Sequence, residues 1–228
     1  MKYIIMCGGV FKDLEIPRQL MNINGEPLVE RTIRLLRKLG VTDISISTSE
    51  GRNDFDYLSM TENIPIIKFH NSYNVRAYND FDGYWCDGFY YTDEPVCYLC
   101  GDVYYSKEAL KQIVETPVDG FGFFGVDRPF PNGYYKCSEE PLAFKVVDQS
   151  ILHNGCKKFR ELQDLGPEKW PFRRRPISWE LVQIIDGVDL RTFIKSKSFI
   201  GVHHFAIDID EPEDAQRVES VVKEFNID

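Results

Sequence analysis

Short apolar runs alternate with longer stretches of helical periodicity along most of the chain. Turn residues bound the apolar runs, and runs of this length between turns are typical of buried strands. They predict strands at 3–6, 44–47, 64–69, 96–99, 121–126, 142–147 and 199–207. The segments 128–140 and 166–176 carry neither pattern and are expected to be loops.

Helical spacing is clearest from Leu28 to Leu39, where apolar residues recur on one face and arginines fall on the other, until Gly40 ends the helix. Similar spacing predicts further helices at 106–114, 149–163, 179–185 and from 212 onward. Strands that alternate with helices favour a parallel sheet covered by helices on both faces. The pattern therefore predicts a three-layer α/β/α fold.

Composition supports a globular chain that folds as one unit. Hydrophobic residues make up 43% of the 228 residues and charged residues 28%, which is far from disordered, fibrous or membrane compositions. Chains of this length often form one α/β domain, and no internal repeat or low-complexity linker divides this one. We expect a single domain over residues 1–228.

The charge balance restricts the partners. A net charge of −9 and an isoelectric point near 5.0 disfavour a nucleic-acid surface, which needs clustered lysine and arginine. Any phosphate must then be bound by a local site. The apolar start at 3–6 is too short for a signal peptide, and no run approaches the roughly 18 apolar residues of a membrane span. We expect a cytoplasmic protein without membrane insertion.

Ligands of open parallel sheets bind beyond the carboxyl ends of the strands. Three such positions carry informative residues: Gly8 and Gly9 after the first strand, Gly101 and Asp102 after the fourth, and the segment 208–210 after the last. The candidate site is expected where these three strand ends meet.

Adjacent glycines after a buried strand allow a tight turn whose bare N–H groups can approach phosphate oxygens. Lys12 and Arg18 follow Gly8 and Gly9 closely and could neutralise the phosphates of a bound triphosphate. The alternative is an ordinary turn followed by a solvated charged loop.

The aspartates provide oxygen ligands. Mg²⁺ prefers one or two carboxylates completed by water and substrate phosphates, and Asp102 with Asp210 could supply them, Asp208 being the substitute for Asp210. Alternatively, Asp102 caps the helix that follows it and Asp210 is the N-cap before Pro212.

In order along the chain, several motifs resemble the nucleotidyltransferase superfamily, which includes sugar-phosphate nucleotidyltransferases, cytidylyltransferases and molybdenum-cofactor guanylyltransferases. The matching segments span nearly the whole chain: 4–9, 17–20, 25–31, 101–102 and 208–214. The resemblance implies a Rossmann-like (GT-A-like) fold with a mixed, mostly parallel sheet.

The resemblance also implies roles for single residues. Lys12 and Arg18 would act on the triphosphate with the glycine loop, and Asp102 would be catalytic as a ligand of Mg²⁺ together with Asp210. The implied nucleotide-binding residues are Met6, Cys7, Gly8, Gly9, Gly83, Tyr84 and Asp87. The chain departs from the family pattern at Val10, where a second glycine is usual, and at Lys12 and Arg18, where arginine and lysine are commoner.

Three residues are candidates for the acceptor. Lys145 and Arg174 could bind an acceptor phosphate, and Glu180 could lie on the acceptor side. In each case there is a simpler interpretation: Lys145 extends to solvent from its strand, Arg174 belongs to a solvated loop, and Glu180 lies in a helix that Trp179 anchors.

The hypothesis is transfer of a nucleoside monophosphate from a nucleoside triphosphate to a small phosphorylated acceptor, with release of pyrophosphate. A sugar-1-phosphate, phosphocholine or a polyol phosphate would be the acceptor. A glycosyltransferase that uses a nucleotide sugar is the first alternative, because Asp208 and Asp210 form an Asp-x-Asp pair. The second is a non-catalytic nucleotide-binding module, suggested by the departures from the pattern. The nucleobase, the acceptor and the oligomeric state stay open.

Overall fold

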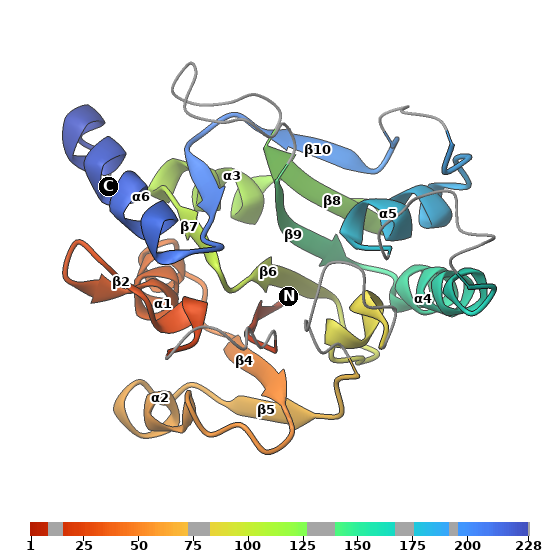
Figure 1. The fold of residues 1–228 in the computed structure, drawn as a ribbon, viewed down its shortest axis with the longest axis horizontal. Helices are drawn as coiled ribbons and strands as arrows, with labels where there is room; N and C mark the ends of the chain where they lie inside the picture. Colours follow the sequence, from red (N-terminus) through yellow and green to blue (C-terminus); the bar gives the residue numbers. More distant parts are fainter. Residues whose placement is uncertain (9–15, 73–82, 127–139, 167–175, 192–195, 228) are drawn as a thin grey trace.

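The computed structural model describes residues 1–8, 16–72, 83–126, 140–166, 176–191 and 196–227. Within these ranges seven strands form one sheet in the order β10-β8-β9-β6-β1-β4-β5 (Figure 1). The strands are β1 (Lys2–Met6), β4 (Ile44–Ser49), β5 (Ile66–Phe69), β6 (Val96–Cys100), β8 (Phe121–Val126), β9 (Pro141–Val146) and β10 (Phe199–Val202). Only β9 runs antiparallel to its neighbours in this sheet, so the predicted mixed, mostly parallel sheet is confirmed.

The same ranges contain the α-helices α1 (Leu28–Lys38), α2 (Asp56–Thr61), α3 (Lys107–Glu115), α4 (Gln149–Gln163), α5 (Ser178–Asp186) and α6 (Pro212–Phe225). Alternate side chains of β1 divide the core. Tyr3 and Ile5 pack with α1 to α3 on one face, and Ile4 packs with α4 and α5 on the other. The predicted three layers follow from this alternation, since each face of the sheet is apolar and needs a covering helix.

The local structure differs from the sequence analysis at two places. Helix α2 was not expected, because its six residues are too few to show helical periodicity. The strand expected at 199–207 is two strands, β10 in the main sheet and β11 (Ala206–Asp208), which pairs with β7 (Val103–Tyr105) in a separate antiparallel ribbon. The apolar pattern continues through 199–207, so it does not reveal that the chain leaves one sheet for another.

Helix α6 lies beside α1 and a small hairpin formed by β2 (Asn22–Ile23) and β3 (Glu26–Pro27) (Figure 1). Val218 and Val222 of α6 share a buried apolar cluster with Ile23 and Ile209. This third cluster packs α6 against residues 21–28. Segments near both termini therefore lie together beside the main sheet.

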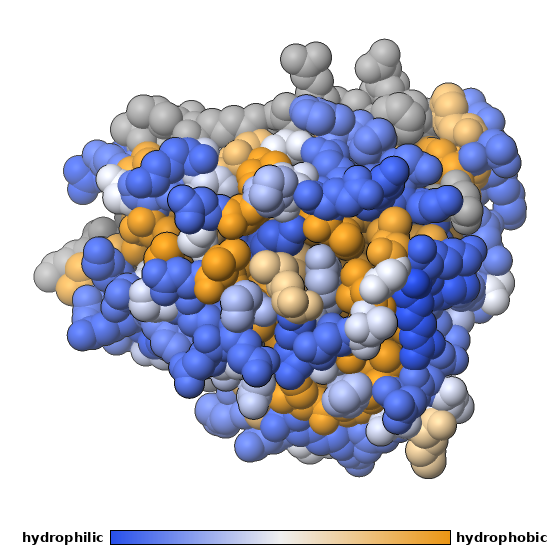
Figure 2. Space-filling model, turned by 180° about the vertical axis from the view of Figure 1, so that it is seen from behind, coloured by the Kyte–Doolittle hydropathy of each residue, from blue (hydrophilic) through white to orange (hydrophobic). Residues whose placement is uncertain are grey.

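From behind, polar side chains cover most of the visible surface and apolar atoms show between them (Figure 2). No helix in the described ranges combines the length and apolar character that a membrane span requires.

Candidate functional site

The carboxyl ends of β1 and β6 lie side by side at one edge of the sheet. Met6 is in register with Cys100, and the Gly101 N–H donates a 3.1 Å hydrogen bond to the Met6 carbonyl. Gly8 and Asp102 come directly after these strands. The expected meeting of the first two strand ends is therefore observed.

Gly101 sits where a larger residue would not fit. A Cβ at this position would lie 2.4 Å from the Met6 carbonyl oxygen, 2.9 Å from Cys7 Sγ and 3.1 Å from Gln19 Cγ. The missing side chain lets the short 3₁₀ helix η1 (Arg18–Leu20) pack close to the two strand ends. Arg18 is thereby brought to the aspartates.

Strand β11 carries the third group of residues to this edge. Asp208 pairs with Val103 in the antiparallel ribbon, and the Ile209 N–H donates to the Asp102 carbonyl at 2.8 Å. Asp210 follows at once. A strand outside the main sheet thus places Asp208 and Asp210 beside Asp102, which follows β6.

The capping alternatives for Asp102 and Asp210 are not what the structure contains. Ser106 caps α3 by accepting a hydrogen bond from the Ala109 N–H at 3.2 Å. At the start of α6, Asp214 accepts from the N–H groups of Asp210 and Glu211 at 3.1 Å and 3.0 Å. Neither helix uses the carboxylate of Asp102 or Asp210 as its cap.

Arg18 joins the two carboxylates. Its Nη1 atom lies 2.6 Å from Asp210 Oδ1 and 3.6 Å from Asp102 Oδ2. The Arg18 side chain is 7% exposed, the Asp102 side chain 27% and the Asp210 side chain 61%. A buried guanidinium therefore bridges one sheltered and one open carboxylate.

Burial is the main cause that raises the pKa of the Asp102 carboxyl, and the charge of Arg18 opposes this rise. Burial also raises the pKa of Asp208 well above its usual range, and the negative charges of Asp102, Asp210 and Glu140 add to the effect. Asp208 Oδ1 is buried without a hydrogen-bond partner among the described residues. The site thus concentrates negative charge that Arg18 partly offsets.

Glu140 is the functional candidate that the sequence analysis missed. Burial is the main cause that raises the pKa of its carboxyl, and the negative charges of Asp210, Asp102 and Asp214 raise it further. Glu140 directly precedes β9, and because β9 is antiparallel, its first residue lies at the edge where the neighbouring strands end. Only the direction of β9 could have identified Glu140, and the apolar pattern of a strand does not reveal direction.

Asp102 and Asp210 are carboxylates of the kind that a magnesium ion takes from a protein. No group of three or more His, Cys, Asp or Glu side chains in the described part of the chain is arranged to hold a metal. Mg²⁺ commonly takes one or two protein carboxylates and completes its shell with water and phosphate oxygens. Asp102 and Asp210 already share one cationic group, the Arg18 guanidinium, so two oxygens converge on a single positive charge here.

Gly8 lies among polar side chains at the ends of β1, β4 and β5. Ser49 Oγ donates to the Gly8 carbonyl at 3.0 Å, and Thr48 Oγ1 donates to the Cys7 carbonyl at 3.4 Å. A Cβ on Gly8 would lie 2.5 Å from Asn71 Nδ2. An added side chain at this position would displace the Asn71 amide. Gly9, Val10 and Lys12 lie outside the described residues, and their proposed roles stay predictions.

The segment around Gly83 is fixed to α4. Gly83 has φ +77°, and a Cβ there would lie 2.0 Å from the Ser72 carbonyl oxygen. Its own carbonyl accepts from Gln163 Nε2 at 2.8 Å, and the Tyr84 hydroxyl donates to Asp164 at 2.6 Å. The positions of Gly83 and Tyr84 thus depend on the end of α4.

Asp87, expected to bind the nucleotide, has both carboxylate oxygens engaged within the protein. It lies in the 3₁₀ helix η2 (Trp85–Gly88) and forms an ion pair with Arg160 of α4, with 2.6 Å between Nη2 and Oδ1. Oδ2 accepts a hydrogen bond from the Ser72 hydroxyl. In this structure Asp87 positions η2 on α4, and its role in nucleotide binding stays a prediction.

Lys145 is bound within the protein in this structure. Its ammonium donates to the carbonyls of Ile113, Val114 and Thr116 at 2.8, 3.1 and 2.7 Å, at the end of α3. The side chain is buried rather than solvated. Lys145 is in register with Cys97, toward the start of β6 and away from Asp102. All three ammonium protons are used there, so Lys145 is a structural residue in this state.

Glu180 has a structural role as well. Its Oε2 accepts a 2.8 Å hydrogen bond from the Ile177 N–H at the start of α5, and the residue is buried. The preceding Trp179 packs edge-on against Phe123, with 4.7 Å between ring centroids. The structure therefore agrees with the simpler interpretation of Glu180 as part of an anchored helix. Arg174 lies outside the described residues.

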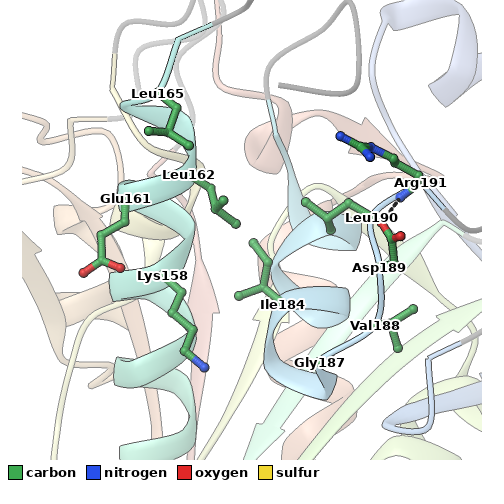
Figure 3. A pocket seen from close by; sticks show the side chains of 10 residues that line it. All are labelled: Lys158, Glu161, Leu162, Leu165, Ile184, Gly187, Val188, Asp189, Leu190 and Arg191. Atoms are coloured by element: carbon green, nitrogen blue, oxygen red, sulfur yellow. Dashed lines mark hydrogen bonds between the residues drawn. The ribbon is translucent and has the colours of Figure 1, made fainter. Parts of the chain in front are cut away.

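A cavity of about 780 Å³ lies elsewhere, between α4 and the segment that follows α5 (Figure 3). Leu162 and Ile184 point toward each other across it, and the Arg191 N–H donates to Asp189 Oδ1 at 2.9 Å on its rim. Its lining residues are Lys158, Glu161, Leu162, Leu165, Ile184, Gly187, Val188, Asp189, Leu190 and Arg191. None of them was singled out by the sequence, and the carboxylates of the candidate site are not among them.

Comparison with solved structures identifies the fold. The inositol-1-phosphate CTP transferase from T. maritima aligns with a TM-score of 0.60 and 15% identity, covering 97% of this chain and 94% of the other. HddC from Yersinia pseudotuberculosis, solved with GMP-PN, aligns with a TM-score of 0.53 and 16% identity over 96% and 98% of the two chains. CTP:phosphocholine cytidylyltransferase from Streptococcus pneumoniae aligns with a TM-score of 0.52 and 14% identity over 97% and 98%.

No protein-family model and no curated protein matches the sequence. The likeness is therefore one of fold, and it extends over nearly the full length of both chains in each pair. The chain has the fold of nucleotidyltransferases, which agrees with the fold class that its motifs predict.

Proposed function

We propose that the protein is a Mg²⁺-dependent nucleotidyltransferase that transfers a nucleoside monophosphate from a nucleoside triphosphate to a small phosphorylated acceptor. The observation that carries the proposal is the arrangement of Arg18 between Asp102 and Asp210 at the carboxyl edge of the sheet. In an open α/β sheet this edge is where ligands bind. A cationic side chain and two carboxylates at that edge suit a phosphate and the metal that accompanies it.

The reaction would proceed by attack of an acceptor phosphate oxygen on the α-phosphorus, with pyrophosphate leaving in line. Bound Mg²⁺ supplies charge neutralisation and orientation of the phosphates. Asp102 and Asp210 would hold the ion, and the backbone at Gly8 would approach the phosphates closely because it carries no side chain. The Arg18 guanidinium would bind the leaving pyrophosphate and offset its developing charge. Catalysis would then consist of positioning and electrostatic stabilisation.

The names of two neighbours support a proposal for the chemical class of the acceptor. Two of the solved structures are named for inositol-1-phosphate and for phosphocholine, both phosphate monoesters of small alcohols. We propose an acceptor of the same kind, a phosphomonoester of a sugar, polyol or amino alcohol. A cytoplasmic location is part of this proposal, because nucleoside triphosphates are available there.

A pyrophosphate-release screen tests the proposal. The four common nucleoside triphosphates are combined with a panel of phosphorylated acceptors, with Mg²⁺ and with a chelator. We expect one pairing to release pyrophosphate only when Mg²⁺ is present. Asp102→Asn and Asp210→Asn should each lower this turnover by about 100-fold or more. Asp43→Asn, at an exposed position after α1, is the control and should retain turnover.

Other outcomes would identify a different function. Full activity in both aspartate variants would show that the metal assignment is wrong. Release of a nucleoside diphosphate from a nucleotide sugar would instead support a glycosyltransferase. Binding of triphosphates without turnover against any acceptor would support a non-catalytic module.

A further inference from the structure

The position of Arg18 has a consequence for metal binding. Its Nη1 atom lies within 2.6 Å of Asp210 Oδ1 and 3.6 Å of Asp102 Oδ2, between the two carboxylates proposed to hold Mg²⁺. Mg²⁺ binds carboxylate oxygens at roughly 2.0–2.1 Å. A guanidinium nitrogen and a metal ion therefore compete for the same oxygens, and their positive charges repel each other at such short range.

We propose that Arg18 is the resident counter-ion of the Asp102 and Asp210 carboxylates, and that a divalent cation binds them well only after a phosphate group has drawn the guanidinium away. The inference rests on the proposed function and concerns the order in which that site fills. Arg18 then has two positions, on the carboxylates without ligand and on phosphate with it.

The surroundings of Arg18 suit such an exchange. The backbone of η1 is fixed by Pro17 before it and by close packing of Gln19 on Gly101, so the base of the side chain stays in place. The long arginine side chain allows its guanidinium to turn toward a neighbouring ligand. Phosphate is a strong competitor, because guanidinium binds phosphate oxygens in a bidentate, charge-assisted geometry.

The neighbouring carboxylates explain why a counter-ion is needed without metal. Asp208 pairs with Val103 beside Asp102, and Glu140 precedes β9 at the same edge of the sheet. Asp208 Oδ1 has no hydrogen-bond partner among the described residues. Folding without a cation would bring these groups together unopposed. Arg18 supplies that charge from within the chain, at the cost of weaker metal binding by the free protein.

The test measures Mn²⁺ binding to the free protein by electron paramagnetic resonance, with no nucleotide present. Arg18→Gln should bind Mn²⁺ roughly tenfold more tightly than the wild type, within the usual range of coupling between sites. Arg37→Gln is the matched control, because Arg37 pairs with Glu62 on the surface between α1 and α2, and it should leave Mn²⁺ affinity unchanged. Equal or weaker Mn²⁺ binding by Arg18→Gln overturns the inference.

A second measurement uses the wild type, so it does not depend on the folding of the variant. Crystals grown with Mn²⁺ and inorganic triphosphate should show an anomalous peak at Asp102 and Asp210, with the Arg18 guanidinium on a phosphate oxygen. Mn²⁺ bound to both aspartates while Arg18 still contacts Asp210 overturns the inference. Tighter Mn²⁺ binding by Arg18→Gln, together with a wild type that releases no pyrophosphate from any substrate, would support the counter-ion role and refute the transferase proposal. Mg²⁺-dependent pyrophosphate release with unchanged Mn²⁺ affinity in Arg18→Gln would do the reverse.

Discussion

Replacing Lys145 by methionine should destabilise the fold without altering affinity for the acceptor. The ammonium donates to three carbonyls at the end of α3, of which the bond to Ile113 is buried and those to Val114 and Thr116 are partly exposed. Methionine retains most of the side-chain volume and removes every donor. The variant therefore separates the structural role of Lys145 from the role in phosphate binding that the sequence suggests.

The size of the effect follows from the three acceptors. The buried Ile113 carbonyl would lose the Lys145 donor, at a cost of about 1–3 kcal/mol, while water can replace the two partly exposed bonds at about 0.5–1.5 kcal/mol each. Burial lowers the pKa of Lys145, because the charged ammonium is costly to bury. Removing that charge therefore offsets part of the stability lost with the hydrogen bonds. We expect a net destabilisation of about 3 kcal/mol, or a fall in Tm of roughly 6–12 °C for a chain of this size.

Thermal and urea unfolding followed by circular dichroism measure this change. Lys157→Met, at an exposed position in α4, is the control and should shift stability by less than about 0.5 kcal/mol. The KM for the acceptor should be unchanged in folded Lys145→Met. A variant as stable as the wild type, with a strongly raised KM for the acceptor, would refute the structural assignment of Lys145.

Three further predictions follow from the site and its support. Gly101→Ala should lower the free energy of unfolding, measured by urea titration, by about 1–3 kcal/mol, because its Cβ would lie 2.4 Å from the Met6 carbonyl oxygen. Gly88→Ala is the control and should be nearly neutral, because a Cβ there meets nothing within 4 Å. Glu140→Gln should raise the Tm relative to the wild type, and the gain should grow as the pH rises above 4.5, the ordinary pKa of glutamate. The reason is that the raised pKa makes the folded wild type hold a proton that the unfolded chain releases, so the wild type loses stability over this range. A Tm difference that does not change with pH would contradict the burial of this carboxyl. Arg160→Gln should raise the KM for the nucleotide in steady-state kinetics, with little change in kcat. The substitution breaks the 2.6 Å ion pair that positions Asp87 and η2 on α4. A normal KM would show that η2 does not contribute to nucleotide binding.

The sequence alone determined the layers of the fold and the positions at which the main strands end. Apolar runs and helical spacing predicted the seven sheet segments and most helices, because burial on one or both faces imposes a period that is visible in the chain. Gly8, Gly101 and Asp102 could be identified for the same reason. A residue just after a buried strand lies at a sheet edge in any parallel α/β fold.

Tertiary structure decided which of these residues meet. Arg18 and Asp210 lie near opposite ends of the chain, and only the packing of η1 on Gly101 and of β11 on β7 brings them to 2.6 Å. No local pattern records such a contact, since its partners belong to elements whose order and direction are set by the whole sheet. The direction of β9 likewise places Glu140 at the site and Lys145 away from it.

The same reason applies to three other candidates. The resemblance suggested Asp87 for the nucleotide and Lys145 for the acceptor, and Glu180 could lie on the acceptor side or belong to an anchored helix. The sequence does not show whether such a side chain has a partner within the protein. The fold supplied partners for all three, in Arg160, in the end of α3 and at the start of α5. At the carboxyl edge it brought together Arg18 and two aspartates that retain accessible surface, and the proposed function rests on these charges.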